Sequence, residues 1–451
     1  MNRRIVLLYA AMAVALLVVG LFQSWNLSLT ILNLCLISAI MALGVNIQWG
    51  YAGLFNTGIM GFAAMGGIAT VLVSMPPVRG AWDAAGAGIG LSIVALIGTI
   101  AATVLAGRWV GGRWRTPAMV ATAIAGFFVI RIFFEPAVAA IEQYDPARTG
   151  YLGGAGMPII VSWLVGGVFA AGAAWLVGKI ALGLRADYLA IATLGISEII
   201  IAMLKNEDWL TRGVRNVTGL PRPVPVEIEL QAAGWFLEFS AWIGASPVVF
   251  SSIFVKICYA LLFAAVLIVL MWFAERALNS PWGRMMRAIR DNREAAEAMG
   301  KDVTRRHLQV FVLGSAVVGV AGAMLTTLDG QFTPGQYNPL RFTFLIWVMV
   351  IVGGSGNNWG AVLGGFLIWF VWVEAEPVGI WLMNALTAGL EPGNIVRTRL
   401  LDAAPHMRLF LMGLILLVVL RFSPNGLIPE RRARPSVAPD RRAVEASGSD
   451  A

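Results

Sequence analysis

The sequence predicts an all-α, polytopic integral membrane protein with about 10 to 12 transmembrane helices. Only 13% of its 451 residues are charged and 58% are apolar, whereas soluble proteins carry about 25% charged residues. No Asp, Glu, Lys or Arg occurs between Ile5 and Val78, a run long enough for about three bilayer crossings. Further uncharged stretches recur without the short alternating pattern of a membrane β-barrel, so we expect helical spans.

The apolar stretches, and the Gly, Pro and charged residues between them, mark twelve candidate spans. These spans cover residues 5–22, 29–47, 57–74, 86–106, 117–134, 158–178, 188–204, 252–273, 308–327, 341–354, 360–374 and 406–421. Loops that stay in the cytoplasm are enriched in Lys and Arg. About two thirds of the 33 basic residues fall in one alternating set of segments, at residues 1–4, 107–116, 179–187, 275–307 and 421–451. We therefore predict that both termini are cytoplasmic.

The predicted domain organisation is a single transmembrane domain over residues 1–428. Two loops on the outer side, 205–251 and 375–405, contain Pro and Trp and are expected to form small ordered caps. The tail 429–451 combines Arg, Pro, Ser and acidic residues with few apolar ones, so we expect it to be disordered in the cytoplasm.

Several classes of site are disfavoured by composition. Cys35 and Cys258 are isolated within apolar runs, and the histidines are His307 and His406, so neither a metal site nor a disulfide framework is expected. The net charge of +8 comes from basic residues scattered at loop edges. We assign that charge to the bilayer surface and expect no nucleic acid partner.

The longest cytoplasmic loop, 275–307, carries the pattern of an amphipathic helix. Ser280-Pro281 offers an N-cap followed by proline at the first helical position, and Gly300 stands where a helix would end. Apolar residues at helical spacing alternate with a polar set, which consists of Arg284, Arg287, Arg290, Arg293 and Glu294. Periodicity alone leaves two interpretations, a helix that contacts a partner protein and a basic helix that rests on anionic lipid.

Within this helix, Glu294-Ala295-Ala296 followed by Gly300 is similar to the EAA loop of permeases in ATP-binding-cassette (ABC) importers. The wider segment 279–300 resembles the branched-chain amino-acid permease family of the LivM type. Further segments that resemble this family are residues 184–195 with Glu198, 218–223, 353–356 with 359–360 and 364, and 422–427. The residues that follow Gly53 depart from many relatives, which leaves the substrate range open.

The resemblance implies an ABC importer permease fold with a cytoplasmic coupling helix, in the cell inner (plasma) membrane. It implies import of branched-chain (Leu, Ile, Val) or related amino acids by alternating access. The implied partners are a homologous second permease, two cytoplasmic ABC ATPase subunits and a periplasmic solute-binding protein. The residues implied in contact with the ATPase are Arg287, Arg290, Glu294, Ala295, Ala296 and Gly300.

An ATPase site is not expected in this chain. A phosphate-binding loop has the form G-x-x-x-x-G-K-[ST], but the Gly-Lys pairs at 178–179 and 300–301 are followed by Ile180 and Asp302. We therefore expect that partner subunits hydrolyse ATP, that the chain is not an enzyme, and that it binds no cofactor of its own.

A glycine-rich segment is the candidate substrate path. An unwound stretch at Gly50, Gly53 and Gly58, together with Asn56 and Thr57, would turn backbone dipoles towards a translocation path. The alternative is close packing of helices through small residues.

Glu198 is a carboxylate within an apolar span and is the second path candidate. It could instead bond to another helix or reach towards the outer boundary of the membrane.

Three other functions remain open from the sequence alone. A urea or short-chain amide ABC permease is the nearest alternative, because such permeases share the general family pattern. An ion-coupled secondary transporter would need more ionisable residues within the spans than Glu198 supplies. A membrane enzyme would need a catalytic cluster that the spans do not display.

Overall fold

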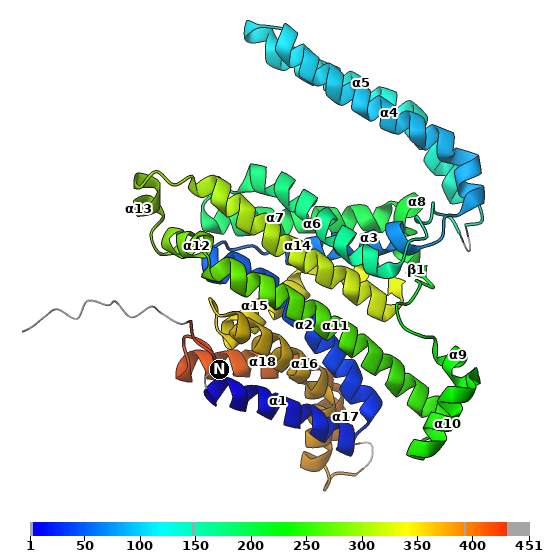
Figure 1. Cartoon of the computed structure of the whole chain (residues 1–451), viewed down its shortest axis with the longest axis vertical. Coiled ribbons are helices and arrows are strands. Elements are labelled where there is room, and N and C mark those ends of the chain that lie inside the picture. Colours follow the sequence, from blue (N-terminus) through cyan, green and yellow to red (C-terminus); the bar gives the residue numbers. More distant parts are fainter. Residues whose placement is uncertain (1–2, 147–148, 392–393, 431–451) are drawn as a thin grey trace, which may run out of the picture.

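The computed structural model describes residues 3–146, 149–391 and 394–430, which form an almost entirely helical assembly (Figure 1). Within these residues, ten helical stretches are long and apolar enough to cross a membrane, and the shorter apolar helices α3 and α15 bring the total to the twelve predicted spans. The twelve are α1 (Arg3–Phe22), α2 (Trp25–Ala52), α3 (Ile59–Ser74), α4 (Arg79–Trp109), α5 (Arg115–Gln143), α6 (Ile159–Ala181), α7 (Ala186–Asn206), α11 (Pro247–Asn279), α14 (Val303–Asp329), α15 (Pro339–Gly353), α16 (Asn358–Leu386) and α18 (Met407–Phe422). The chain is a multi-pass helical membrane protein.

Shorter elements connect the spans. The α-helices among them are α8 (Asp208–Thr211), α9 (Glu227–Ala232), α10 (Gly234–Ile243), α12 (Pro281–Asp291), α13 (Arg293–Ala298) and α17 (Ile395–Asp402). The 3₁₀ turns are η1 (Gly112–Trp114), η2 (Gly213–Arg215), η3 (Pro334–Gln336) and η4 (Ala404–His406). In the described residues, β1 (Val217–Thr218) pairs antiparallel with β2 (Gln331–Phe332), with Val217 opposite Phe332.

The bundle has two ends, which we name by the helices found there. The α12 end carries α12 and α13, and the α10 end carries α9 and α10, at the left and right of Figure 1. Ile5 of α1 packs against Ile428, and Glu430 pairs with Arg290 of α12. The first and last described parts of the chain therefore both lie at the α12 end.

Helix α2 lies at the centre of the core. Every residue from Cys35 to Gln48 is buried, because α14, α16, α11 and α15 surround this helix. Glycines allow the close contacts: a Cβ at Gly44 would press on Val318 of α14, and one at Gly66 of α3 would collide with the carbonyl oxygen of Gly319. The core therefore depends on small residues that match in pairs across helices.

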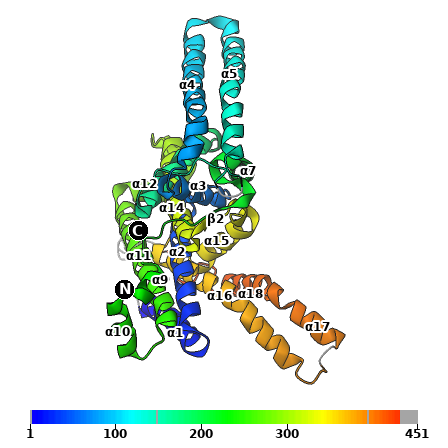
Figure 2. The ribbon, with the colours of Figure 1, turned by 90° about the vertical axis from the view of Figure 1, so that its right-hand side faces the viewer.

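The α4–α5 hairpin stands apart from this core. Both views show the two helices packed along each other and extending away from the bundle (Figures 1 and 2). Their buried residues are few and gather near the base, at Ala81, Ala85, Ile89, Ser92, Ala137 and Ile141. At the base, Val78 N–H donates to Leu152 O (3.1 Å), which closes the hairpin onto the following segment.

The two loops predicted on the outer side differ from their predicted boundaries. Helix α16 continues to Leu386, well beyond the predicted end at residue 374, because residues 375–386 remain largely apolar and Pro377 is accommodated within the helix. The loop predicted at 205–251 contains α8, α9 and α10, as expected of an ordered cap, and its last residues already belong to α11.

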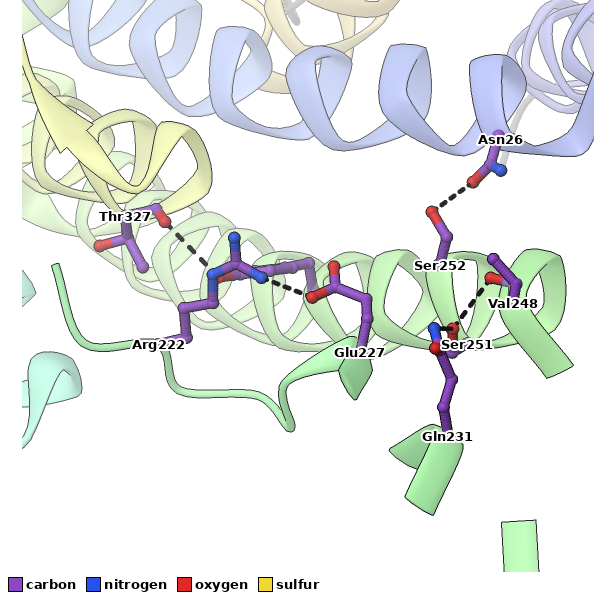
Figure 3. A network of polar contacts seen from close by, with 9 residues as sticks. Asn26, Arg222, Glu227, Gln231, Val248, Ser251, Ser252 and Thr327 are labelled. Carbon is purple, nitrogen blue, oxygen red and sulfur yellow. Dashed lines mark hydrogen bonds and ion pairs between the residues drawn. The ribbon is translucent and has the colours of Figure 1, made fainter. Parts of the chain in front are cut away.

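Figure 3 shows how the cap formed by the 205–251 segment is fastened to the spans. Arg222 forms an ion pair with Glu227 (2.8 Å), and Gln231 Nε2 donates to Ser251 Oγ (2.8 Å) at the start of α11. The next residue, Ser252, donates from Oγ to Asn26 Oδ1 of α2 (2.8 Å). The cap is therefore held to α11, and α11 to α2.

Candidate functional site

The amphipathic helix predicted over residues 280–300 is divided into two helices. Helix α12 ends at Asp291 and α13 begins at Arg293. The prediction of a single helix over residues 280–300 was therefore wrong. The break occurs at Asn292, which adopts an extended backbone and accepts the N–H of Ala295 on its side-chain oxygen (2.9 Å). An asparagine in this role starts a new helix, because it satisfies an N–H that has no partner within the helix.

One face of α12 and α13 packs on the spans and the other faces outward. Met286, Ile289 and Ala296 are buried, as the amphipathic pattern predicted, whereas Met299 is exposed. Glu294, Ala295 and Gly300 are also exposed. Gly300 has φ +74° and no described atom within 4 Å of a Cβ placed on it. These exposed residues form a surface that a soluble partner can reach.

Arg287 and Arg290 do not belong to that exposed surface. Arg287 donates to the carbonyl oxygen of Leu278 (3.0 Å), and Arg290 donates to the carbonyl oxygen of Gly50. Both side chains are partly buried. The sequence placed them on the polar outer face, but the structure uses them to fasten α12 to the spans.

Arg290 also holds the end of the described chain. Its guanidinium forms an ion pair with Glu430 (3.0 Å) and a second pair with Asp291 (3.1 Å). Burial by itself would lower the pKa of Arg290, but the hydrogen bonds and charges of Glu430 and Asp291 raise it above its usual value. Glu430, predicted to belong to a disordered tail that begins at Pro429, is thus held in place by Arg290, and the tail beyond Glu430 lies outside the described residues.

Two of the resemblance motifs meet beside Arg290. The N–H groups of Leu427 and Ile428 donate to the carbonyl oxygens of Val352 and Gly353 (both 2.9 Å). Gly354 and Gly426 both have positive φ, and a Cβ on Gly426 would collide with Gly354. Glycine is therefore required where the segment after α18 crosses the α15–α16 turn.

A cavity of about 580 Å³ opens at this junction. Gly50, Gly53, Arg290, Ser355 and Glu430 contribute to its lining. Two of the predicted path residues, Gly50 and Gly53, therefore border an open space at the α12 end. Their role in transport stays a prediction.

The other residues of the glycine segment are committed to internal hydrogen bonds. Residues 53–58 are unwound, as predicted. Asn56 Nδ2 donates to Gln48 Oε1 and Asn56 Oδ1 accepts the N–H of Gly58 (both 2.9 Å). Thr57 N–H donates to Thr193 Oγ1 of α7 (3.1 Å), and a Cβ on Gly58 would approach the backbone of Thr193. In this conformation the segment joins α2 and α3 to α7.

Glu198 does not lie with this segment. It is exposed on α7, five residues beyond Thr193 and therefore about 140° further around the helix axis. Its neighbour Ser197 is buried against Gly61 of α3. The structure thus divides the predicted path residues between a cavity, an internal junction and an exposed helix face.

The sequence analysis missed two buried polar networks near this site. Gln48 donates to Phe311 O (2.9 Å) and to Ser315 Oγ (3.0 Å) of α14. Asn46 donates to Asn358 Oδ1 (3.0 Å) and accepts the N–H of Gly356 (2.9 Å). An amide within an apolar span was the available signal, because such a group must find partners in the protein.

Aromatic side chains close the space above the cavity. The rings of Trp49, Phe55 and Trp347 contact one another with centroids 4.6 to 5.5 Å apart. The Trp347 indole N–H donates to Asn56 O (3.1 Å). The unwound segment therefore contributes Phe55 to this aromatic cluster and binds Trp347 through a hydrogen bond.

These features define a multi-pass helical membrane protein with a packed junction beneath a short exposed helix. A family model described as the branched-chain amino acid transport system / permease component matches residues 118–420. The chain belongs to this family.

Curated relatives agree with this assignment. A probable branched-chain amino acid transport permease protein LivM from Methanocaldococcus jannaschii is 28% identical over 267 residues, which cover 59% of this chain and 66% of the relative. The high-affinity branched-chain amino acid transport system permease protein LivM of Escherichia coli is 27% identical and is covered over 57% of its length. The xylose transport system permease protein XylH of Escherichia coli is 25% identical, with 60% of this chain and 62% of the relative covered.

The chain thus spans less than two thirds of the length of these relatives. No solved structure matches the chain.

Proposed function

We propose that the chain is a permease subunit of an ABC importer that moves branched-chain or related amino acids into the cytoplasm. The main support is the exposed surface formed by α13 and Gly300, which has the residues of an EAA loop. This surface adjoins the junction at which Arg290 of α12 binds Gly50 and Glu430. A force applied to this surface would reach α2, α15 and the segment after α18 through Arg290. The family membership and the LivM relatives support this function.

In this proposal the α12 end faces the cytoplasm of a cell with the subunit in its inner membrane. The basic residues that cluster in the segments of this end support that orientation. Two separate ATPase subunits would contact α13, and a periplasmic solute-binding protein would deliver substrate to the cap at the α10 end.

A second, homologous permease would cover the exposed face of α7. Glu198 supports this partner, because a carboxylate within a span is costly when lipid surrounds it and is usually turned towards protein or water. We propose that the path runs along this face and leaves through the cavity beside Gly50 and Gly53. Asn56, Thr57 and Gly58 would release their internal bonds, or move as a unit with α7, when the subunit changes state.

The test uses the complete transporter, with the tagged subunit purified from membranes together with its partners and reconstituted for ATP-driven uptake. We expect uptake of leucine, isoleucine or valine. Gly300→Leu should abolish most uptake, because a branched side chain is poorly tolerated at positive φ, and Glu294→Arg should do the same by reversing a charge on the contact surface. Both variants should be present at normal levels.

Gly183→Leu is the matched control, because Gly183 is also an open position between α6 and α7 at the α12 end and has no positive φ. It should retain uptake. Normal uptake by both Gly300→Leu and Glu294→Arg would contradict α13 as the ATPase contact. Uptake of urea or short amides, without any branched-chain amino acid, would contradict the proposed substrate class.

A further inference from the structure

A second cavity lies towards the α10 end of the core. Its volume is about 240 Å³, and it is lined by residues of α2, α3, α14, α15 and α16. Most of its lining is apolar and comes from Ile37, Met41, Phe342, Leu345, Ile346 and Trp369. A cavity of about 150 Å³ with a similar lining can hold benzene. This one therefore has room for the side chain of a leucine or isoleucine.

The mouth of the cavity carries an acidic group. Asp329 and Gln336 both line it and both are exposed, and Gln336 Nε2 donates to Asp329 Oδ2 (2.9 Å). Asp329 is the last residue of α14, where the helix dipole adds further negative potential. Asp329 takes part in no ion pair among the described residues. The mouth thus presents a negative region that a small cation can approach.

A positive group lies beside the aromatic wall of the cavity. The Arg341 guanidinium lies 4.9 Å from the ring centroid of Trp372 and 5.5 Å from that of Phe342, and both rings line the cavity. Arg341 is exposed and sits in the first turn of α15, where the dipole is positive. The cavity therefore has a negative helix end at its mouth and a cation at a helix start beside its aromatic wall.

The aromatic wall holds a further donor. Trp369 stacks on Phe342 with ring centroids 6.4 Å apart. Its buried indole N–H has no acceptor in the described part of the chain.

From this arrangement we infer that the cavity is an amino-acid binding site within the single subunit, on the outer side of the core. The ammonium group would bind at Asp329, the carboxylate at Arg341, and the branched apolar side chain would fill the space between Ile37, Met41 and Ile346. This inference rests on the proposed function and adds to it the place where the side chain is selected. A neutral molecule or a lipid chain would use the apolar wall but would leave both charges unmatched.

The experiment compares two variants in the complete reconstituted transporter, at saturating solute-binding protein. Ser38→Leu narrows the cavity, since Ser38 is buried in its lining. It should lower the ratio of the leucine uptake rate to the alanine uptake rate at least about tenfold. A hydrophobic pocket discriminates by about this factor between substrates that differ by one methylene group. Asp329→Asn keeps the shape of an exposed side chain and should lower uptake of both amino acids. Asp83→Asn, an exposed aspartate at the base of α4, is the control and should have no effect.

The results separate the two levels of the proposal. If the unaltered transporter imports leucine, and Ser38→Leu and Asp329→Asn assemble normally with unchanged rates and unchanged leucine-to-alanine ratio, the cavity site is wrong and the importer function stands. An equal loss of leucine and alanine uptake in Ser38→Leu, with Asp329→Asn unaffected, would also overturn the site. If the unaltered transporter imports no branched-chain amino acid, both proposals fail.

Discussion

The α3–α14 pair and the α4–α5 pair are both apolar, yet they are covered in different ways. Helices α3 and α14 approach so closely that Gly66 and Gly319 leave no space for a side chain. On α4, Gly90 and Gly98 have no described atom within 4 Å of an added Cβ. Apolar composition therefore predicts that a segment lies in a membrane, but matched small residues decide whether protein or lipid covers it.

The largest expected effect follows from filling the tightest of these contacts. Gly66→Val should destabilise the subunit by about 3 kcal/mol, because a well-packed interior does not accept added methyl groups without moving the backbone. Gly98→Val on α4 should leave stability within about 0.5 kcal/mol. The measurement is thermal unfolding of the purified subunit in detergent, together with the yield of monodisperse protein. Equal stability of the two variants would remove the proposed difference between the helix pairs.

A smaller effect is expected from removing a buried amide. Gln48→Leu leaves the Asn56 side-chain N–H without its acceptor, whereas the Phe311 carbonyl within α14 loses only a second donor. Each buried group left unsatisfied costs about 1–3 kcal/mol, and the melting temperature should fall accordingly. Thr99→Val in α4 is the control, because Thr99 bonds only to its own helix at Ala95 O (2.7 Å) among the described residues. A drop for Thr99→Val as large as that for Gln48→Leu would mean that the hairpin contributes a buried network of its own.

The smallest effect concerns the charges on the hairpin. Arg131 and Glu135 of α5 form an ion pair, and each side chain is more than half exposed. The double substitution Arg131→Leu with Glu135→Leu should change the stability of the isolated subunit by less than about 1 kcal/mol, because an apolar pair can replace an ion pair at little cost. The same unfolding assay measures it. A loss of several kcal/mol would show that this face packs against the bundle more closely than the structure indicates.

The sequence predicted the positions of the ten helical stretches long enough to cross a membrane and of the shorter apolar helices α3 and α15, since uncharged apolar runs and the charges between them are local features. It could not predict the break at Asn292, because an Asn followed by Arg293 and Glu294 fits a helix interior as well as a new start. The role of Arg290 was also hidden, since its partners are Gly50 and Glu430, far away in the sequence. Contacts of this kind depend on tertiary structure alone.

The same limit applies to the candidate site. The EAA residues could be found by resemblance, and their exposure agrees with a contact surface. The cavity near Asp329 could not be found in this way, because its walls come from five helices and Arg341 is connected to it only by the rings of Trp372 and Phe342. Neither residue stands in a recognisable motif.

Helix α14 connects the exposed surface of α13 with the cavity mouth at Asp329. It begins at Val303, three residues after Gly300, and ends at Asp329, so its 27 residues span about 40 Å at 1.5 Å per residue. Gly66, Gly166 and Gly319 bring α3, α6 and α14 into backbone contact, which prevents the three helices from sliding past one another. A tilt of only ~5° at the α13 side would carry Asp329 sideways by roughly 3 Å over that length. A displacement of this size would widen or narrow the cavity mouth at Asp329, while the contacts among α3, α6 and α14 stay unchanged.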